Sequence, residues 1–256
     1  MRKITINLAA VAAFCIVVAS PALVSSSCAT PKTEQEDTTI IREDSGITAL
    51  KYSSPEVPAS IEFCGKTIDL SRFDRHERMD RELLAFTYMH STSLQMLKKA
   101  NRYFPIVEPI LKENGIPDDF KYLMVIESNM NPTARSSAGA AGLWQFMQGT
   151  GRDYGLEVNN NVDERYHIEK ATRAACRYLK DAYAKYKDWV AVAASYNAGQ
   201  ARIASQLAKQ DVDDSLDLQL VEETARYVYR ILAAKQLFNA PTTFGFRLRA
   251  SDLYPP

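Results

Sequence analysis

The central stretch of this sequence is FKYLMVIESNMNPTARSSAGAAGLWQFM, residues 120–147. In it, a short apolar run ends on a single acid, Glu127, and a polar turn rich in Gly and Ser leads to a second amphipathic start at Leu143. Apolar surroundings cost a carboxylate its hydration, and the negative end of a helix dipole disfavours its anion. Because both effects raise a carboxyl pKa, Glu127 is a candidate for proton transfer. The alternative interpretation is an ordinary solvated glutamate at a helix end.

Apolar residues recur at helical spacing on both sides of this stretch, and no alternating strand pattern separates them. The pattern predicts one helix over residues 75–101 and another that begins at Pro105 and ends at the cap Gly115. After Pro117 the chain restarts as the helix that carries Glu127. Further helices are predicted over residues 143–147, 164–183, 189–196 and 222–238, with a break at Gly149 and Gly151. The core is therefore predicted to be all-α.

The N-terminus has the composition of an export signal. Arg2 and Lys3 precede a mostly apolar run over residues 4–19, and small residues follow as far as Ser27. The run is shorter than the roughly 20 apolar residues that a membrane span needs. Two processing routes fit the sequence: acylation of Cys28 as in lipoproteins, which we favour, or cleavage among the small residues around it. Both routes predict export.

Lys and Arg together number 31, as do Asp and Glu, so no net charge favours nucleic acid or an anionic membrane surface. A neutral or mixed substrate fits better. The three histidines are far apart, and no His-Glu-x-x-His or Cys-x-x-Cys motif occurs, so we predict no metal and no cofactor. Cys64 and Cys176 lie in the predicted folded part, where two isolated cysteines are more typical of buried thiols than of a disulfide.

Two clusters carry side chains suited to binding sugars. The loop before Trp144 and Gln145 is rich in Gly, but no Lys-Ser or Lys-Thr follows and no strand precedes it, which disfavours phosphate binding. An indole and an amide instead match the ring faces and hydroxyl groups of a sugar. The second cluster, ASYNAG at residues 194–199, ends a predicted helix on Tyr196 and Asn197. Each cluster by itself also fits a purely structural interpretation, as a turn, a core tyrosine and a helix cap.

Four motifs occur in an order that is similar to that of a known enzyme family. They are Glu127-Ser128, Gly142-Leu143-Trp144-Gln145, residues 194–199, and Glu223-Thr224 with Tyr227-Val228. The sequence resembles the lysozyme-like lytic transglycosylases, and most closely their membrane-bound lytic murein transglycosylase D type, over about residues 75–245. The resemblance implies a lysozyme-like helical domain of the SLT type with a substrate groove.

The resemblance also implies that the protein cleaves the β-1,4 bond between N-acetylmuramic acid and N-acetylglucosamine without water, giving 1,6-anhydromuramyl products. In this family one glutamate acts first as acid to the leaving oxygen and then as base on the muramyl 6-hydroxyl, so a second carboxylate is not required. Glu127 is the expected catalytic residue. Substrate binding is implied for Ser128, Gln145, Tyr196, Asn197 and Tyr227, with Tyr196 hydrogen-bonded at the Glu127 site.

Two other functions fit the motifs less well. A lysozyme on the same fold would use water, with Asp153, Asp163 or Glu164 as a second acid, but Asp163 fits better as the N-cap of the helix that begins at Glu164. A non-catalytic peptidoglycan-binding envelope protein would predict a damaged Glu127 or groove, whereas the motifs are intact.

The chain is predicted to contain five parts. They are a signal peptide (1–27), a flexible tether (28–60), an accessory segment with a short extended piece and a helix (61–104), the lytic transglycosylase catalytic domain (105–245) and a C-terminal tail (246–256). The expected partner is the peptidoglycan glycan strand, with no nucleic acid, and the sequence names no protein partner. The expected location is the periplasm, with membrane contact only through a lipid anchor at Cys28 in the outer membrane. No LysM wall-binding repeat follows residue 245, so wall affinity is expected from the groove or the anchor.

Overall fold

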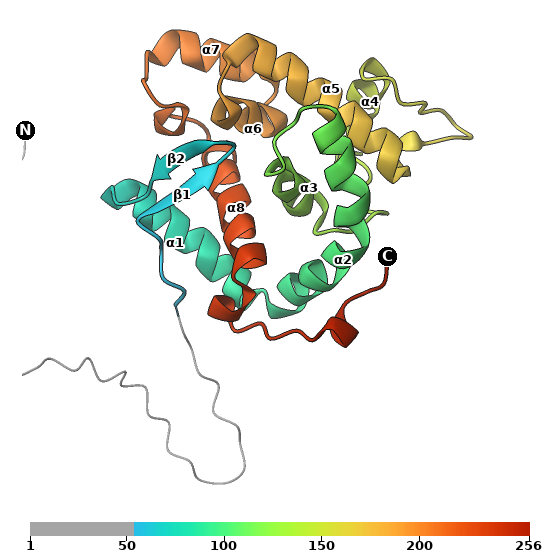
Figure 1. Cartoon of the computed structure of the whole chain (residues 1–256). Helices are drawn as coiled ribbons and strands as arrows, with labels where there is room; N and C mark the ends of the chain where they lie inside the picture. The colour runs from blue at the N-terminus through green and yellow to red at the C-terminus, as the bar shows by residue number, and fades with distance from the viewer. Residues whose placement is uncertain (1–53) are drawn as a thin grey trace, which may run out of the picture. The chain divides into compact units, whose positions relative to one another are not determined.

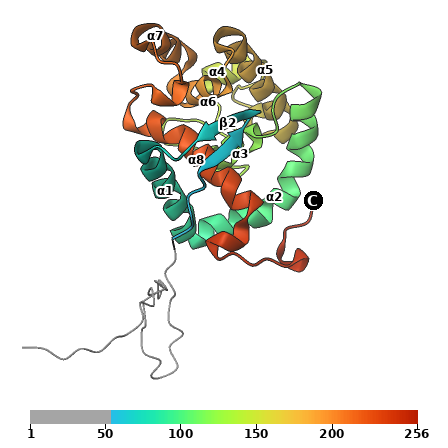
Figure 2. The same ribbon diagram turned by 60° about the vertical axis from the view of Figure 1, so that its left-hand side comes forward.

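The computed structural model describes residues 54–256 and places helix α3 (Phe120–Ser128) in their middle (Figure 1). The fully buried side chains of this helix are Phe120, Leu123, Met124 and Val125. Helices α2 and α8 pack against it, and a second view shows the same arrangement (Figure 2). The helix ends at Asn129 and Met130, whose φ angles of 49° and 59° are left-handed. Glu127 therefore lies in the last turn, as predicted.

The described residues contain eight α-helices, one two-stranded sheet and four short 3₁₀ turns. The helices are α1 (Phe73–Tyr88), α2 (His90–Glu113), α3, α4 (Gln148–Asp153), α5 (Ile168–Tyr186), α6 (Trp189–Ala198), α7 (Gln200–Gln210) and α8 (Glu222–Asn239). The strands are β1 (Ser60–Phe63) and β2 (Lys66–Asp69), and the turns are Glu164–Tyr166, Ser215–Asp217, Pro241–Phe244 and Ala250–Asp252. The predicted fold class, a mostly helical domain, is confirmed.

The extended segment predicted after residue 60 is a β-hairpin. Its strands pair antiparallel with Ile61 opposite Ile68, and both side chains are buried. Cys64 and Gly65 form the two-residue turn, with φ angles of 53° and 82° that match the tight turns preferred between antiparallel strands. Gly65 therefore supports the hairpin as its turn residue, although glycine weakens the interior of a strand.

The helix boundaries predicted around Pro105 are wrong. Helix α2 runs without interruption from His90 to Glu113 and contains both Pro105 and Pro109. A proline removes one backbone hydrogen bond and crowds the turn before it. Here the two prolines lie four residues apart on one exposed face, where the backbone carbonyls that they leave free can be hydrated. The break lies instead at Met89, which divides the helix predicted over residues 75–101 between α1 and α2.

The helix predicted over residues 143–147 is also wrong. Residues 142–145 form a turn between the bridged residues Ala141 and Phe146, and Gly142 and Gln145 have φ angles of 78° and 48°. The apolar side chains in this stretch are buried because the turn packs into the core. Helix α4 follows instead at residues 148–153 and includes Gly149 and Gly151, where a break was predicted.

The remaining helices follow the sequence pattern more closely. Helices α6 and α8 confirm the predictions for residues 189–196 and 222–238 to within two residues. Helix α5 begins at Ile168, later than predicted, because residues 164–166 form a separate 3₁₀ turn that Asp163 caps. Helix α7 was not predicted.

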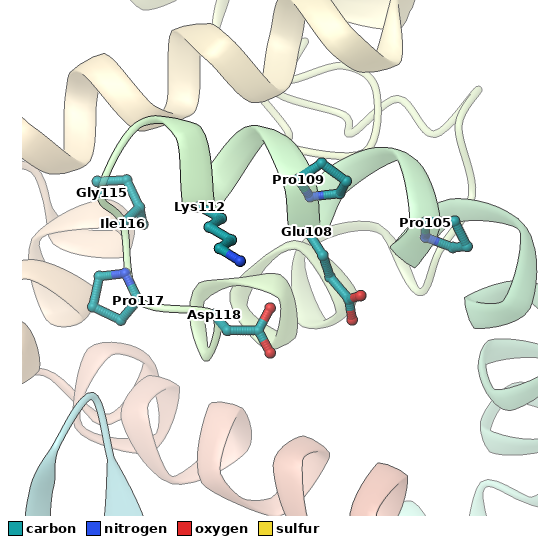
Figure 3. A pocket seen from close by; sticks show the side chains of 8 residues that line it. All are labelled: Pro105, Glu108, Pro109, Lys112, Gly115, Ile116, Pro117 and Asp118. Carbon is teal, nitrogen blue, oxygen red and sulfur yellow. The ribbon is translucent and has the colours of Figure 1, made fainter.

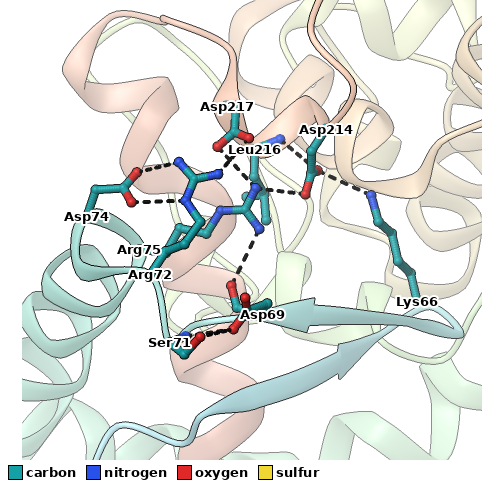
Figure 4. A network of polar contacts seen from close by, with 9 residues as sticks. All are labelled: Lys66, Asp69, Ser71, Arg72, Asp74, Arg75, Asp214, Leu216 and Asp217. Atoms are coloured by element: carbon teal, nitrogen blue, oxygen red, sulfur yellow. Dashed lines mark hydrogen bonds and ion pairs between the residues drawn. The ribbon is translucent and has the colours of Figure 1, made fainter.

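Charged side chains fasten the hairpin and α1 to the loop before α8 (Figure 4). Arg75 of α1 is 5% exposed, and its Nη2 atom lies 2.8 Å from Asp214 and 3.0 Å from Asp217. Lys66 of β2 also contacts Asp214, at 3.2 Å. A buried guanidinium needs such partners because an unpaired charge in the interior is strongly destabilising. The hairpin, α1 and this loop are therefore held as one unit.

A second ion pair, buried on its Glu82 side, joins α1 to α8. Glu82 is 2% exposed, and its two carboxylate oxygens accept hydrogen bonds of 2.6 and 3.2 Å from Arg226. The guanidinium and the carboxylate form a bidentate pair. A bidentate contact fixes the rotation of α8 as well as its distance from α1. Residues before 105 thus help to orient the helix that carries Tyr227.

Several predictions concern residues outside the described range. The signal peptide, Cys28 and the tether as far as residue 53 lie there. Within residues 54–256, every helix is too short or too polar to cross a bilayer. Cys64 and Cys176 both carry free thiols, and burial raises the pKa of Cys176 to about 11. The two cysteines are therefore separate thiols, as the sequence indicated.

Candidate active site

Glu127 projects from the last turn of α3 toward α8. It is partly exposed, and its Oε1 atom accepts a short hydrogen bond from the Tyr227 hydroxyl. Burial of the carboxyl raises the pKa of Glu127 to about 7; the Tyr227 hydrogen bond and the charge of Arg230 lower it, and Glu223 raises it. The acid can therefore give up and regain a proton near neutral pH.

Tyr227 is 3% exposed and lies on the face of α8 that meets α3. Burial, together with the neighbouring charge of Glu127, raises the pKa of Tyr227 well above its ordinary value. The phenol therefore stays protonated and acts as a neutral donor. A neutral donor orients the carboxyl group without imposing a charge on it.

Tyr196 does not make the hydrogen bond to Glu127 that was predicted for it. Its hydroxyl donates to the backbone carbonyl of Trp144 at 2.8 Å, and the hydrogen bond to Glu127 comes from Tyr227. The Tyr196 ring packs against Tyr178, with ring centroids 5.1 Å apart. Burial, and then the charge of Glu127, raise the pKa of Tyr196 well above its ordinary value. Tyr196 thus lies close enough to sense Glu127, but it holds the loop that contains Gln145.

The Gln145 side chain is tied back into its own loop. Its Nε2 atom donates to the carbonyls of Ala134 at 3.2 Å and Gly142 at 2.8 Å. Because both neighbours are acceptors, the NH₂ group must face them, and its two protons are used. Within residues 54–256, the amide oxygen of Gln145 is then the group of this side chain that has no hydrogen-bond partner.

Asn197 is joined to two residues at the start of α8. The Thr224 hydroxyl donates to Asn197 Oδ1 at 2.8 Å, and Asn197 Nδ2 donates to Glu223 Oε1 at 3.3 Å. Glu223 and Thr224 lie four and three residues before Tyr227, so each of them neighbours Tyr227 on the surface of α8. In the sequence analysis Glu223 and Thr224 were part of a motif but had no role. Their helical spacing from Tyr227 could have indicated that they lie at the same site.

Ser128 is buried, and its hydroxyl donates to the Met124 carbonyl of its own helix at 3.3 Å. The structure therefore places Ser128 next to Glu127 along the chain but turns its hydroxyl into α3. This bond is a local helix contact of a common kind.

A hollow of about 300 Å³ brings together three of the predicted binding residues, Gln145, Tyr196 and Asn197. Its other lining residues are Phe146, Met147, Thr150, Tyr178, Ala198 and Gly199. Amides and aromatic rings of this kind suit a neutral sugar. A larger hollow of about 790 Å³ lies between α2 and the loop before α3 and contains none of the predicted site residues (Figure 3).

Asp163 and Glu164, the acids just before α5, already interact with neighbouring groups of the protein. The Arg165 side chain holds the pKa of Asp163 below its ordinary value, and the Glu157 backbone N–H and Lys170 do the same for Glu164. Within residues 54–256, no group of three His, Cys, Asp or Glu side chains could hold a metal ion. The arrangement suits acid and base chemistry by Glu127 on a neutral ligand.

Comparison with known proteins finds a family model that matches part of this chain. The family model described as Transglycosylase SLT domain matches residues 105–217. Membrane-bound lytic murein transglycosylase D of Escherichia coli strain K12 is 30% identical over 181 residues, which are 69% of this chain and 39% of that protein. Peptidoglycan transglycosylase gp16 of Escherichia phage T7 is 30% identical over 138 residues, which are 52% of this chain and 10% of that protein.

The 70 kDa soluble lytic transglycosylase of Escherichia coli is among the similar solved structures, with a TM-score of 0.48 and 21% identity over 60% of this chain and 26% of that one. This chain spans about two fifths of the length of the first relative. The family match includes Glu127, Gln145 and Tyr196 and ends before Tyr227.

Proposed function

Residues 105–217 of this chain belong to the transglycosylase SLT family, and on that premise we propose that the protein is a peptidoglycan lytic transglycosylase. It cleaves the β-1,4 bond between N-acetylmuramic acid and N-acetylglucosamine and forms a 1,6-anhydromuramyl end. The observation that carries the proposal is the setting of Glu127. Its carboxyl has a pKa raised to about 7 and is held by the neutral phenol of Tyr227.

The reaction needs one group that is first an acid and then a base. Protonated Glu127 donates its proton to the glycosidic oxygen while the bond from that oxygen to C1 of the muramyl sugar breaks. N-acetylglucosamine leaves with a 4-hydroxyl. The Glu127 carboxylate then accepts the proton of the muramyl 6-hydroxyl, whose oxygen bonds to C1 and closes the anhydro ring. Glu127 ends protonated, so the cycle needs no water and no cofactor.

The other site residues hold the substrate and the acid. Tyr227 donates to the carboxyl before the reaction and stabilises the carboxylate that forms after the first proton transfer. Gln145, Tyr196 and Asn197 line one hollow together and bind the sugars. Ser128 supports the end of α3 next to Glu127.

Digestion of purified murein tests this function directly. Mass spectrometry is expected to find muramyl ends lighter by one water molecule than hydrolysis products and resistant to borohydride reduction. Reducing muramyl ends would instead indicate a muramidase that uses water, and an absence of soluble products would indicate a binding protein.

The pH profile gives a second test of the role of Glu127. Because the first step needs protonated Glu127, turnover is expected to fall as pH rises past about 7. The charge of Glu223 raises the pKa of Glu127, so Glu223→Gln lowers that pKa and moves the alkaline limb to lower pH. Glu222→Gln is the matched control, since Glu222 pairs with Arg81. Its alkaline limb stays at the wild-type position, and an equal shift in both variants would contradict the assignment.

We also propose that the protein acts in the cell envelope, exported by residues 1–27 and attached to the outer membrane through acylated Cys28. The apolar signal and the cysteine that follows it support this location. Growth with an alkyne fatty acid is expected to label the wild-type chain and not Cys28→Ala. Equal labelling of both chains, or of neither, would show that Cys28 does not carry a lipid anchor.

A further inference from the structure

Arg165 is a buried arginine whose polar contacts all lie inside the protein. Its side chain is 4% exposed. Nε and Nη2 donate to the two carboxylate oxygens of Asp163 at 2.8 and 2.7 Å, and Nη1 donates to the carbonyls of Gly139 at 2.8 Å and Phe146 at 3.0 Å. Asp163 neutralises the guanidinium on one side, which leaves Nη1 to hold two backbone carbonyls on the other.

These two carbonyls bracket the segment that carries Gln145. We call residues 139–146 the Gln145 segment. Arg165 contacts it near both ends, at Gly139 and Phe146, and also in its middle. There Gly142 lies so close to the backbone of Arg165 that a Cβ atom on it would be 1.9 Å from the Arg165 carbonyl oxygen. Arg165 therefore contacts both ends of the Gln145 segment with its side chain and the middle of it with its backbone.

Gln145 needs such support because its backbone is in an unfavourable conformation. A φ angle of 48° is uncommon for a residue with a side chain and persists only where the surroundings impose it. The same conformation brings the Gln145 amide against the Gly142 carbonyl, which fixes the NH₂ group inward. Among the described residues the amide oxygen then has no hydrogen-bond donor, and Gln145 lines the hollow together with Tyr196 and Asn197.

We propose that Arg165 is a positioning residue for the reaction: by clamping the Gln145 segment it presents the Gln145 oxygen to the substrate as a hydrogen-bond acceptor. The group recognised is then a donor on the sugar, a hydroxyl or an amide N–H. This inference rests on the proposed function. Lysine cannot replace arginine here, since its single ammonium lacks the planar fork that reaches a carboxylate and two carbonyls together.

Arg165→Lys keeps the charge and removes the fork. It is expected to lower kcat/KM on purified murein by about 10–100-fold, because a displacement of about 1 Å in a positioning group has effects of this size. Arg177→Lys is the matched control. Arg177 also donates to a backbone carbonyl, that of Tyr154 at 3.0 Å, but in a loop that does not carry Gln145. Its activity stays within about two-fold of wild type.

A double-mutant cycle separates positioning from general stability. If Arg165 acts through Gln145, Arg165→Lys adds less than about two-fold to the loss already caused by Gln145→Ala. If it causes the same loss in both backgrounds, Arg165 acts on the fold as a whole and the proposal is wrong. The alkaline limb of the pH profile is expected to stay in place in Arg165→Lys, because Glu127 is not touched.

A readout without turnover keeps this inference apart from the proposed function. In the wild-type protein, the two side-chain NH₂ protons of Gln145 are expected to give separate NMR signals with slow exchange, and Gln145→Ala identifies them. In Arg165→Lys they move toward the values of a free amide, whereas in Arg177→Lys they do not. Unchanged signals in Arg165→Lys would overturn the clamp. An inactive wild-type protein with the expected NMR changes would overturn only the proposed function.

Discussion

Glu127→Gln lowers the turnover of purified murein by about 10³-fold, because the proton that leaves and returns during the reaction is lost with the carboxyl group. Glutamine keeps the size of the side chain, and its oxygen can still accept the hydrogen bond from Tyr227. Binding of glycan fragments is therefore expected to remain near the wild-type level. Turnover by release of soluble muropeptides and binding by calorimetry measure the two effects separately.

Glu164→Gln is the matched control for this substitution. Glu164 is one of the acids that a water-dependent lysozyme mechanism would need, and here it pairs with Lys170 and accepts the Glu157 backbone N–H. Its replacement is expected to leave turnover near wild type. An equal loss in Glu164→Gln would favour two carboxylates over one, and full activity in Glu127→Gln would remove Glu127 from the mechanism.

Glu127→Gln also has an expected effect on protein stability, and the sign of this effect follows from the raised pKa of Glu127. The pKa of Glu127 is about 7 in the folded protein and 4.5 ordinarily, so the folded state binds this proton more tightly. The resulting stabilisation is complete below the ordinary value and is lost as pH rises through about 7. Glu127→Gln does not ionise and should therefore melt at a higher temperature than wild type at pH 8, with a smaller difference at pH 5. A lower melting temperature at pH 8 would show that burial does not disfavour the carboxylate.

The parts of the fold that the sequence predicted are those whose signals are local. Helix α6 begins where Asp188 caps the Val190 N–H and ends at Gly199, with a φ of 86°. Both capping residues lie directly at the ends of α6, so each is a local sequence feature. Helix α8 likewise shows its buried face through apolar spacing over its full length.

The errors occur where distant contacts override local patterns. Leu143, Trp144 and Phe146 look like one apolar helix face, but the Trp144 indole N–H donates to Thr172, 28 residues away, and Arg165 holds the Phe146 carbonyl. These contacts make a turn more favourable than a helix. Similarly, Pro105 reads as a helix start until the exposure of its face is known.

The site shows the same division. The raised pKa of the Glu127 carboxyl could be predicted because a single acid at the end of an apolar run is a local feature. Which tyrosine meets it could not, because the direction of each hydroxyl depends on how α8 packs on α3 and how α6 packs on the Gln145 segment. Tyr227 therefore took the contact that was predicted for Tyr196.

Gly142→Ala destabilises the protein by about 3 kcal/mol, which is about 6–12 °C in melting temperature for a folded part of this size. The added Cβ would lie 1.9 Å from the Arg165 carbonyl oxygen and 2.8 Å from its carbonyl carbon. Both atoms belong to the backbone, so no side-chain rotation relieves the overlap. The φ of 78° adds a further cost for any residue with a Cβ. Thermal denaturation of the full chain measures the loss.

Gly139→Ala separates these two causes. Gly139 lies in the same segment with a φ of 89°, but a Cβ on it would meet no atom within 4 Å. It therefore carries the conformational cost of about 1 kcal/mol without the overlap. The difference between the two variants measures how rigidly Arg165 and the Gln145 segment are pressed together. Equal losses would mean that this segment yields easily, and a segment that yields could not hold Gln145 in its unfavourable conformation without substrate.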